Sequence, residues 1–220
     1  AREWYREGKF GSVFYIETEY HHDMTNDGPR LRFYKGKPTW RYGFPPMHYP
    51  THSLAFVTGI TGERLSEVMC IGDRAKNIPY YEDNKYENPF CNSVAMYKTD
   101  RGNPVRHSEF RHVAAGICER AQWYGDKMSF FMPTPNGAPA TVCHIGKRPE
   151  EFDQPMHWET DMLPKPLRHS SGHGGSHTFI THEFVSALVE NRRPAVDVYE
   201  AVAYTAQIGR ASCRERVCHR

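Results

Sequence analysis

Between residues 64 and 145 the chain is a succession of short runs rich in β-branched and aromatic residues, and no other feature constrains the fold as strongly. Turn sequences separate several of these runs, at Asp-Arg-Gly (100–102) and Pro-Asn-Gly (135–137). Because tight turns join antiparallel neighbours, five or six antiparallel strands are expected here. These strands are predicted at 64–71, 92–97, 105–115, 117–124, 128–132 and 140–145, and a further strand at 11–20 precedes them.

Helical spacing occurs outside this run of strands. Residues 52–62 carry apolar side chains at helical intervals before a terminal glycine, and a second helix is expected around Phe184. The last helix begins at Asp197, which forms a capping-box arrangement with Glu200. Strands flanked by helices predict an α+β fold, with an open, mainly antiparallel β-sheet and helices packed on one face.

Length and composition indicate one globular domain. The chain has 220 residues, of which 39% are hydrophobic and 25% charged, and a chain of this size can bury one substantial core. No apolar run approaches the roughly 20 residues of a membrane-spanning helix, so no membrane partner is expected. The predicted domain covers residues 1–207.

Residues 208–220 differ from the rest of the chain. Ten consecutive residues, Ile-Gly-Arg-Ala-Ser-Cys-Arg-Glu-Arg-Val (208–217), resemble the translation of a common sequencing-adapter oligonucleotide. We therefore expect a non-native tail. Without it the chain has 24 basic and 25 acidic residues, and its formal charge falls from +2 to −1. The basic balance thus gives no reason to expect nucleic acid as a partner.

The first eight residues are typical of the last turns of a helix that a glycine, Gly8, ends. Neither an initiator Met nor an export-signal pattern occurs at the start. We expect the chain to be the interior of a longer protein and to be cytoplasmic, with a periplasmic location left open.

The segment His-Tyr-Pro-Thr-His-Ser (48–53) is the first candidate site. Pro50 should push Tyr49 toward an extended conformation, and Thr51 is suited to cap the following helix. The positive end of that helix favours the phenolate of Tyr49 and the neutral imidazole of His52. Tyr49 and His52 are therefore predicted as a proton-transfer pair. The alternative is a capping turn with a hydrogen-bonded histidine.

The second candidate site is Gly-His-Gly-Gly-Ser-His-Thr (172–178). Its glycines allow a ligand to approach the backbone, and a helix starting near Thr178 would present free N–H groups to ligand oxygens. His173, Ser176 and His177 are predicted to position a polar substrate. A flexible loop with an ordinary helix cap is the alternative.

Arg106 and Trp123 are two further candidate substrate contacts. Strand alternation divides residues 106–112 into Arg106, Ser108, Phe110 and His112 on one side and His107, Glu109 and Arg111 on the other. One side could line a polar pocket, although solvated charges are the more common outcome. Trp123 could stack on a sugar ring, or it could belong to the core.

A metal site is not expected, despite 13 histidines. No His-Glu-x-x-His motif and no paired cysteine spacing occurs, and adjacent His21 and His22 must point to opposite faces of a strand. Outside the tail the cysteines are widely spaced, so they are predicted to be buried free thiols. They are Cys70, Cys91, Cys118 and Cys143.

Several motifs carry a family resemblance in combination. They are Glu-Tyr-His-His-Asp (19–23), Pro-Pro-Met-His-Tyr-Pro-Thr-His (45–52), Glu-Arg-Ala-Gln-Trp-Tyr-Gly (119–125), Gly-His-Gly-Gly-Ser-His (172–177), Glu-Phe-Val-Ser-Ala (183–187) and Pro-Ala-Val-Asp-Val-Tyr-Glu-Ala (194–201). Over roughly residues 1–207 the chain resembles the C-terminal domain of the Gfo/Idh/MocA oxidoreductases. One departure is clear: many relatives carry an Asp four residues before the motif histidine, where this chain has His48.

The resemblance implies a two-domain enzyme whose N-terminal Rossmann domain binds NAD or NADP. This chain has no Gly-x-Gly-x-x-Gly fingerprint of its own, so alone it should have little activity. The implied reaction is hydride transfer to or from a sugar or polyol, with Tyr49 or His52 handling the hydroxyl proton. His48, Arg106, Trp123, His173, Ser176 and His177 would contact the substrate, and the open sheet face would form a homo-oligomer.

Three alternatives remain open. The Tyr-Pro-Thr-His form (49–52) also resembles NAD-dependent glycosidases of the same superfamily, which act by transient oxidation and elimination with the tyrosine as base. A non-catalytic carbohydrate-binding or oligomerisation module is the second alternative. A zinc hydrolase that uses the clustered histidines is the third.

Overall fold

A computed structural model describes residues 1–25, 33–74, 76–153 and 161–206, which cluster into two compact units. The larger unit contains residues 1–151 and the described residues from 202 onward, and the smaller contains residues 152–201. Each unit is described by itself. The predicted tail at 208–220 lies outside the described residues. In the described part of the chain, no helix is both long enough and apolar enough to cross a bilayer.

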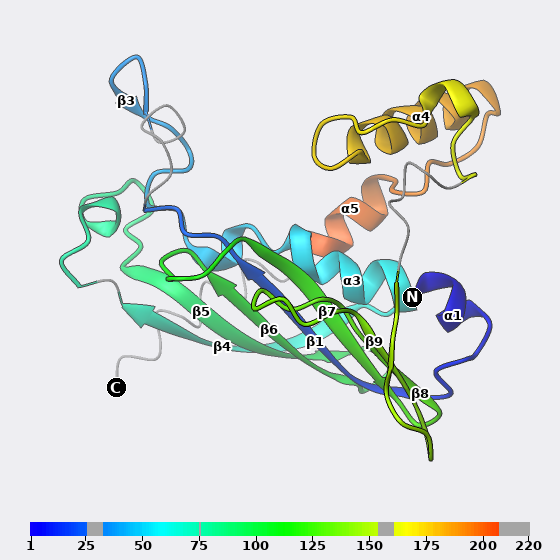
Figure 1. Cartoon of the computed structure of the whole chain (residues 1–220). Coiled ribbons are helices and arrows are strands. Elements are labelled where there is room, and N and C mark those ends of the chain that lie inside the picture. The colour runs from blue at the N-terminus through cyan, green and yellow to red at the C-terminus, as the bar shows by residue number, and fades with distance from the viewer. Residues whose placement is uncertain (26–32, 75, 154–160, 207–220) are drawn as a thin grey trace. The chain divides into compact units, whose positions relative to one another are not determined.

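An eight-stranded sheet is the scaffold of the larger unit (Figure 1), with the order β10-β9-β8-β7-β1-β6-β5-β4. Its strands are β1 (Val13–His21), β4 (Leu65–Arg74), β5 (Phe90–Thr99), β6 (Pro104–Phe110), β7 (Cys118–Gly125), β8 (Met128–Phe131), β9 (Thr141–His144) and β10 (Glu150–Glu151). Every neighbouring pair is antiparallel except β1 and β6, which run parallel. The predicted α+β class and mainly antiparallel sheet are confirmed.

The first strand lies in the middle of the sheet, between β6 and β7. Strands β4 to β6 form one meander and β7 to β10 another, and β1 joins them. The strand expected over 105–115 therefore stops at Phe110, because the chain must then pass β1 before it can begin β7 at Cys118. The sequence predicted these two strands as successive and could not show that β1 lies between them.

Helix α3 (Thr51–Thr61) covers one face of the sheet at β1 and β7 (Figure 1). Its Leu54 and Val57 are buried, as are Ile16 on β1 and Trp123 on β7. The short helix α1 (Arg2–Arg6) contacts α3, and Gly8 follows it with φ 70°, as a glycine that ends a helix requires. Apolar burial between helix and sheet therefore fixes the position of the first turn of α3.

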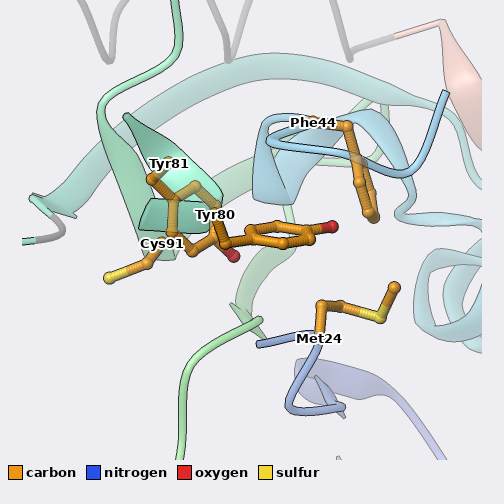
Figure 2. Close-up of a cluster of buried hydrophobic side chains, with 5 residues drawn as sticks. All are labelled: Met24, Phe44, Tyr80, Tyr81 and Cys91. Atoms are coloured by element: carbon orange, nitrogen blue, oxygen red, sulfur yellow. The ribbon is translucent and has the colours of Figure 1, made fainter. Parts of the chain in front are cut away.

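A second apolar cluster fixes the loops beside that turn (Figure 2). It contains Met24 after β1, Phe44 ahead of the 3-10 helix η1 (Pro46–His48), Tyr80 and Tyr81 of the 3-10 helix η2 (Pro79–Tyr81), and Cys91 on β5. Tyr49 packs against the cluster. A small hairpin of β2 (Phe33–Tyr34) and β3 (Lys37–Pro38) lies between β1 and η1 in the chain.

The smaller unit contains a 3-10 helix, η4 (Lys165–Leu167), and helix α4 (Ser176–Val189). Helix α5 (Val198–Thr205) follows. The predicted cap of α5 is confirmed, because the Glu200 N–H donates to Asp197 Oδ1 at 2.9 Å. Helix α4 begins two residues earlier than the expected start near Thr178.

Candidate functional site

Tyr49 and His52 lie where the 3-10 helix η1 passes almost directly into α3. Pro50, with φ −83° and ψ −6°, precedes the helix, and its carbonyl accepts the Leu54 N–H at 2.8 Å. Thr51 is already helical and makes no capping hydrogen bond, so the predicted Thr51 cap is wrong. Tyr49 has φ −133° and ψ 48° and donates its N–H to the Pro46 carbonyl at 3.3 Å. It therefore closes a turn and does not reach the expected extended conformation.

The two predicted catalytic side chains lie next to one another, and both pack against Tyr20 of β1. The ring centroids of Tyr49 and His52 are 4.7 Å apart. His52 also stacks on Tyr20 of β1, with centroids 4.5 Å apart and an interplanar angle of 13°. Tyr20 is only 4% exposed. A buried strand residue thus fixes the plane of the His52 imidazole.

Glu119 on β7 completes this arrangement, and the sequence analysis did not single it out. His52 Nδ1 lies 2.7 Å from Glu119 Oε1. The β1–β7 register pairs Tyr20 with Glu119, which places both side chains on the α3 side of the sheet. A carboxylate on Nδ1 orients the ring and leaves Nε2 to exchange a proton with a bound hydroxyl group.

A buried ionic cluster adjoins the rings of Tyr20 and Tyr49. His107, Glu109 and Arg111 are 0%, 0% and 1% exposed, so the expectation of solvated charges on this side of β6 is wrong. Arg111 forms an ion pair with Glu109, and His107 Nε2 lies 3.1 Å from Glu109 Oε2. The Arg111 guanidinium lies over the ring of Tyr20, at 4.4 Å, and that of Tyr49, at 5.4 Å.

Burial is the largest influence on the pKa values of Glu109 and Tyr20. It raises the pKa of Glu109, while the charges of Arg111 and His107 act in the opposite direction. Burial also raises the pKa of Tyr20, and the Arg111 charge again opposes the shift. Arg111 is the buried cation of the cluster, and its charge faces the rings of both tyrosines.

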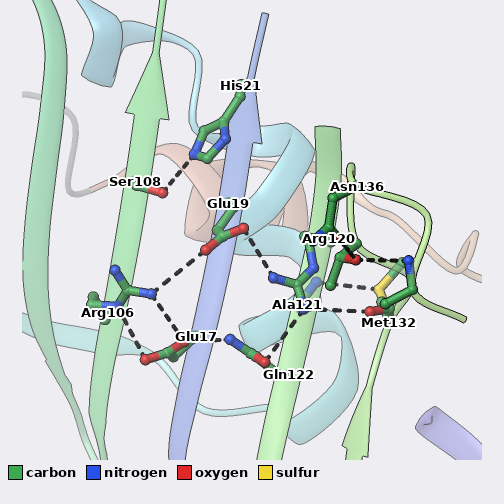
Figure 3. Close-up of polar contacts among 12 residues, drawn as sticks. Glu17, Glu19, His21, Arg106, Ser108, Arg120, Ala121, Gln122, Met132 and Asn136 are labelled. Carbon is green, nitrogen blue, oxygen red and sulfur yellow. Dashed lines mark hydrogen bonds and ion pairs between the residues drawn. The ribbon is translucent and has the colours of Figure 1, made fainter. Parts of the chain in front are cut away.

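Three of the predicted substrate contacts do not join Tyr49 and His52. Arg106 points to the opposite, open face of the sheet, where its Nε and Nη2 donate to Glu17 at 3.1 and 3.0 Å (Figure 3). Trp123 is 2% exposed, donates its indole N–H to the Phe56 carbonyl at 3.1 Å and stacks on Phe130. The structure corrects both expectations, because one side chain is on the wrong face and the other belongs to the core. His48 is exposed, and its ring lies edge-on to Tyr86.

The second motif forms a compact turn in the smaller unit. The rings of His173 and His177 are 4.8 Å apart, and Ser176 Oγ donates to the His173 carbonyl at 3.0 Å. A Cβ at Gly172 would lie 2.4 Å from His177 Nδ1, so a side chain there would collide with the ring. His177 also borders a depression of about 430 Å³ together with His169, Thr181 and His182. The smaller unit thus presents its own group of histidines and hydroxyls.

The described residues do not form a dinucleotide site. The phosphates of NAD are held by a glycine-rich turn between a strand and a helix in a βαβ unit. In the described sheet, the one parallel pair, β1 and β6, is separated along the chain by β4 and β5, and no such turn follows β1.

No protein-family model and no curated protein sequence matches the chain significantly. Solved structures do match. An oxidoreductase domain protein from Kribbella flavida has a TM-score of 0.71 at 17% identity, over 99% of this chain and 60% of that protein. The aldose-aldose oxidoreductase of Caulobacter crescentus, complexed with glycerol, has a TM-score of 0.69 at 14% identity, over 99% and 57%.

An inositol dehydrogenase homolog from Azotobacter vinelandii, complexed with NADH and myo-inositol, has a TM-score of 0.60 at 14% identity, over 98% of this chain and 58% of that protein. The chain thus spans under two thirds of the length of each of these proteins. At such identities the likeness establishes a shared fold. The resemblance to the C-terminal domain of the Gfo/Idh/MocA oxidoreductases is confirmed at the level of the fold.

Proposed function

We propose that this chain is the C-terminal, substrate-binding part of an NAD(P)-dependent oxidoreductase that acts on a sugar, a polyol or a related hydroxylated substrate. The observation that carries the proposal is the His52–Glu119 contact of 2.7 Å beside Tyr49. The fold supports it, because the same fold occurs in an aldose-aldose oxidoreductase and in an inositol dehydrogenase homolog.

The site residues supply the proton chemistry of this reaction. A substrate hydroxyl beside His52 Nε2 gives its proton to the ring as the hydroxyl carbon is oxidised, and the reverse step returns it. Glu119 accepts the Nδ1–H and stabilises the imidazolium that forms. The Tyr49 and His52 rings lie 4.7 Å apart between centroids, and the Tyr49 hydroxyl can hydrogen-bond a second substrate oxygen. Nicotinamide supplies or accepts the hydride in such enzymes.

The smaller unit by itself also carries groups that suit a polar ligand. His173 and His177 offer ring nitrogens, and the turn around Gly174 and Gly175 keeps the backbone accessible through positive φ angles of 61° and 92°. Such groups suit the hydroxyl oxygens of a carbohydrate. The open sheet face would associate with a second copy of the chain.

The test uses the longer protein encoded around this chain, recovered from its source. Its NAD(P)-dependent turnover is measured with a panel of aldoses, inositols and nucleotide sugars. His52→Gln and Tyr49→Phe should each lower kcat/KM by roughly a hundredfold or more. His144→Gln on β9, outside the site, is the matched control and should leave kcat/KM unchanged.

Other outcomes would overturn the proposal. Release of sugar from aryl glycosides without net NADH formation would identify a glycosidase in which Tyr49 is the base. Carbohydrate binding without turnover would identify a non-catalytic module. Unchanged kcat/KM in both site variants would show that Tyr49 and His52 take no part in the reaction.

A further inference from the structure

Three metal-binding side chains meet on the open face of the sheet, opposite the Tyr49–His52 site. Glu19 and His21 alternate to this face along β1, and the register pairs His21 with Cys118 at the start of β7. One potential ligand atom from each of Glu19, His21 and Cys118 lies within 4.8 Å of the others. In the described part of the chain no other such group of three is found.

Two residues of β6 hold the His21 ring in place. Ser108 Oγ lies 2.9 Å from His21 Nε2 (Figure 3), and Ser108 is itself only 3% exposed. The ring also stacks on Phe110, with centroids 4.3 Å apart and an interplanar angle of 12°. Metal-bound histidines commonly use the second ring nitrogen for a hydrogen bond that fixes orientation and tautomer. Here that bond occupies Nε2 and leaves Nδ1 for a metal ion.

Salt bridges hold the carboxylate without preventing coordination. Glu19 Oε2 lies 3.1 Å from Arg120 Nη1, and Oε1 lies 3.5 Å from Arg106 Nη2 (Figure 3). Glu17 takes the closer contacts of Arg106, so two acids balance two bases on this face. If Glu19 bound the metal through Oε1 alone, its Oε2 would keep the salt bridge with Arg120.

Zinc binds the thiolate form of cysteine and the neutral form of histidine. Coordination by Cys118 should therefore release the thiol proton at neutral pH.

We propose that Glu19, His21 and Cys118 bind a zinc-type divalent cation that links β1 to β7 on the open face of the sheet. Mixed oxygen, nitrogen and sulfur donors suit Zn²⁺, whose tetrahedral bond lengths place ligand atoms about 3.5 Å apart. Side-chain rotations that bring the three donor atoms about 1 Å closer together would fill three of the four coordination positions of the ion. Water would take the fourth. This site is independent of the proposed oxidoreductase function.

The test is metal binding by the purified chain after chelator treatment. Added Co²⁺ should bind at one ion per chain, produce a thiolate-to-cobalt charge-transfer absorption and release a proton. Cys118→Ser should abolish the absorption, and His21→Ala should weaken Zn²⁺ affinity by roughly tenfold to a hundredfold. Cys143→Ser is the control, since it removes a partly exposed thiol on β9 and should change neither quantity.

A measurement on the unaltered chain guards against variants that fail to fold. Zn²⁺ added to the native protein should raise its urea unfolding midpoint, because the ion binds the folded chain. An unchanged midpoint, absence of the charge-transfer absorption, or cobalt absorption that persists in Cys118→Ser would each overturn the proposal.

Discussion

His52 Nδ1 lies 2.7 Å from Glu119 Oε1, and this contact joins the first turn of α3 to strand β7. The two residues are far apart in sequence and meet because β1 lies beside β7 and carries Tyr20 beneath the imidazole. The orientation of the histidine is thus set from two strands.

Glu119→Gln in the longer protein should lower kcat by roughly tenfold to a hundredfold and leave KM nearly unchanged. The amide can still hydrogen-bond the ring, but it cannot stabilise an imidazolium. Steady-state kinetics would show this split. Glu67→Gln is the control, because Glu67 is an exposed acid paired with Lys98 on the edge of the sheet. An equal loss of kcat in Glu119→Gln and Glu67→Gln would show that Glu119 does not belong to the site.

Trp123→Ala should destabilise the chain by roughly 3–5 kcal/mol, because the indole is 2% exposed and packed between α3 and the sheet. Trp40→Ala, at a side chain 48% exposed, should cost under about 1 kcal/mol. Urea unfolding measures both. A Trp123 variant of normal stability that instead raises the KM for sugar would restore the expected substrate role.

Sequence periodicity was sufficient for most of the fold. Apolar alternation located β4, β5, β7, β8 and β9, and the capping box at Asp197 located the start of α5. These features depend on nearby residues. The insertion of β1 between β6 and β7 depends on pairing over about a hundred residues, which no local pattern encodes.

In the candidate site, too, local sequence predicts some features, and others depend on residues that are far apart in the chain. The proximity of Tyr49 and His52 was predictable because a proline turn precedes a helix. Glu119 was not, since its role follows from the pairing of Tyr20 with Glu119. Alternation on β6 correctly separated Arg106 from His107 and Glu109, but it could not say which set α3 would cover. The structure buries His107 and Glu109 and leaves Arg106 on the open face.

Arg111→Met should destabilise the chain by roughly 3–5 kcal/mol, because it leaves the carboxylate of Glu109 buried without its ion-pair partner. Replacing both residues, as Arg111→Met with Glu109→Leu, should recover part of that loss, since no uncompensated charge remains. Arg101→Met, at an exposed arginine, should cost under about 1 kcal/mol. Denaturant titrations measure the free energy of unfolding of each variant. Equal losses of stability in Arg101→Met and Arg111→Met would contradict the buried ion pair.

The Glu17–Arg106 pair should make stability depend on acid pH. Burial alone would raise the pKa of Glu17, but hydrogen bonds from Arg106 and Tyr15 and the Arg106 charge bring the pKa below its usual 4.5. A group with a lowered pKa in the folded state contributes stability above the unfolded pKa, and this is lost as pH falls through the folded pKa.

Acidification below about pH 4.5 should therefore lower the free energy of unfolding more steeply in the native chain than in Arg106→Met. Urea titrations across a pH series provide the measurement. Lys98→Met, which removes the exposed partner of Glu67, is the control and should retain the steep dependence. Identical slopes in the native chain and Arg106→Met would show that the pair is not coupled to folding.

The open sheet face should form the contact of a homo-oligomer. Met69, Ile71, Val94 and Met96 form an apolar strip on β4 and β5, and each is at least 36% exposed. The neighbouring strands carry acids and bases side by side on the same face, so a two-fold axis can place unlike charges opposite one another.

Ile71→Lys should weaken self-association at least tenfold, because a lysine would then lie in the apolar part of an interface that a stable dimer must extend to about 1,000 Å². Sedimentation velocity over a range of protein concentrations measures the effect. Ile145→Lys, at an exposed isoleucine just beyond β9, introduces the same charge away from the strip and should leave association intact. A native chain that stays monomeric at every concentration would show that this face binds no second copy.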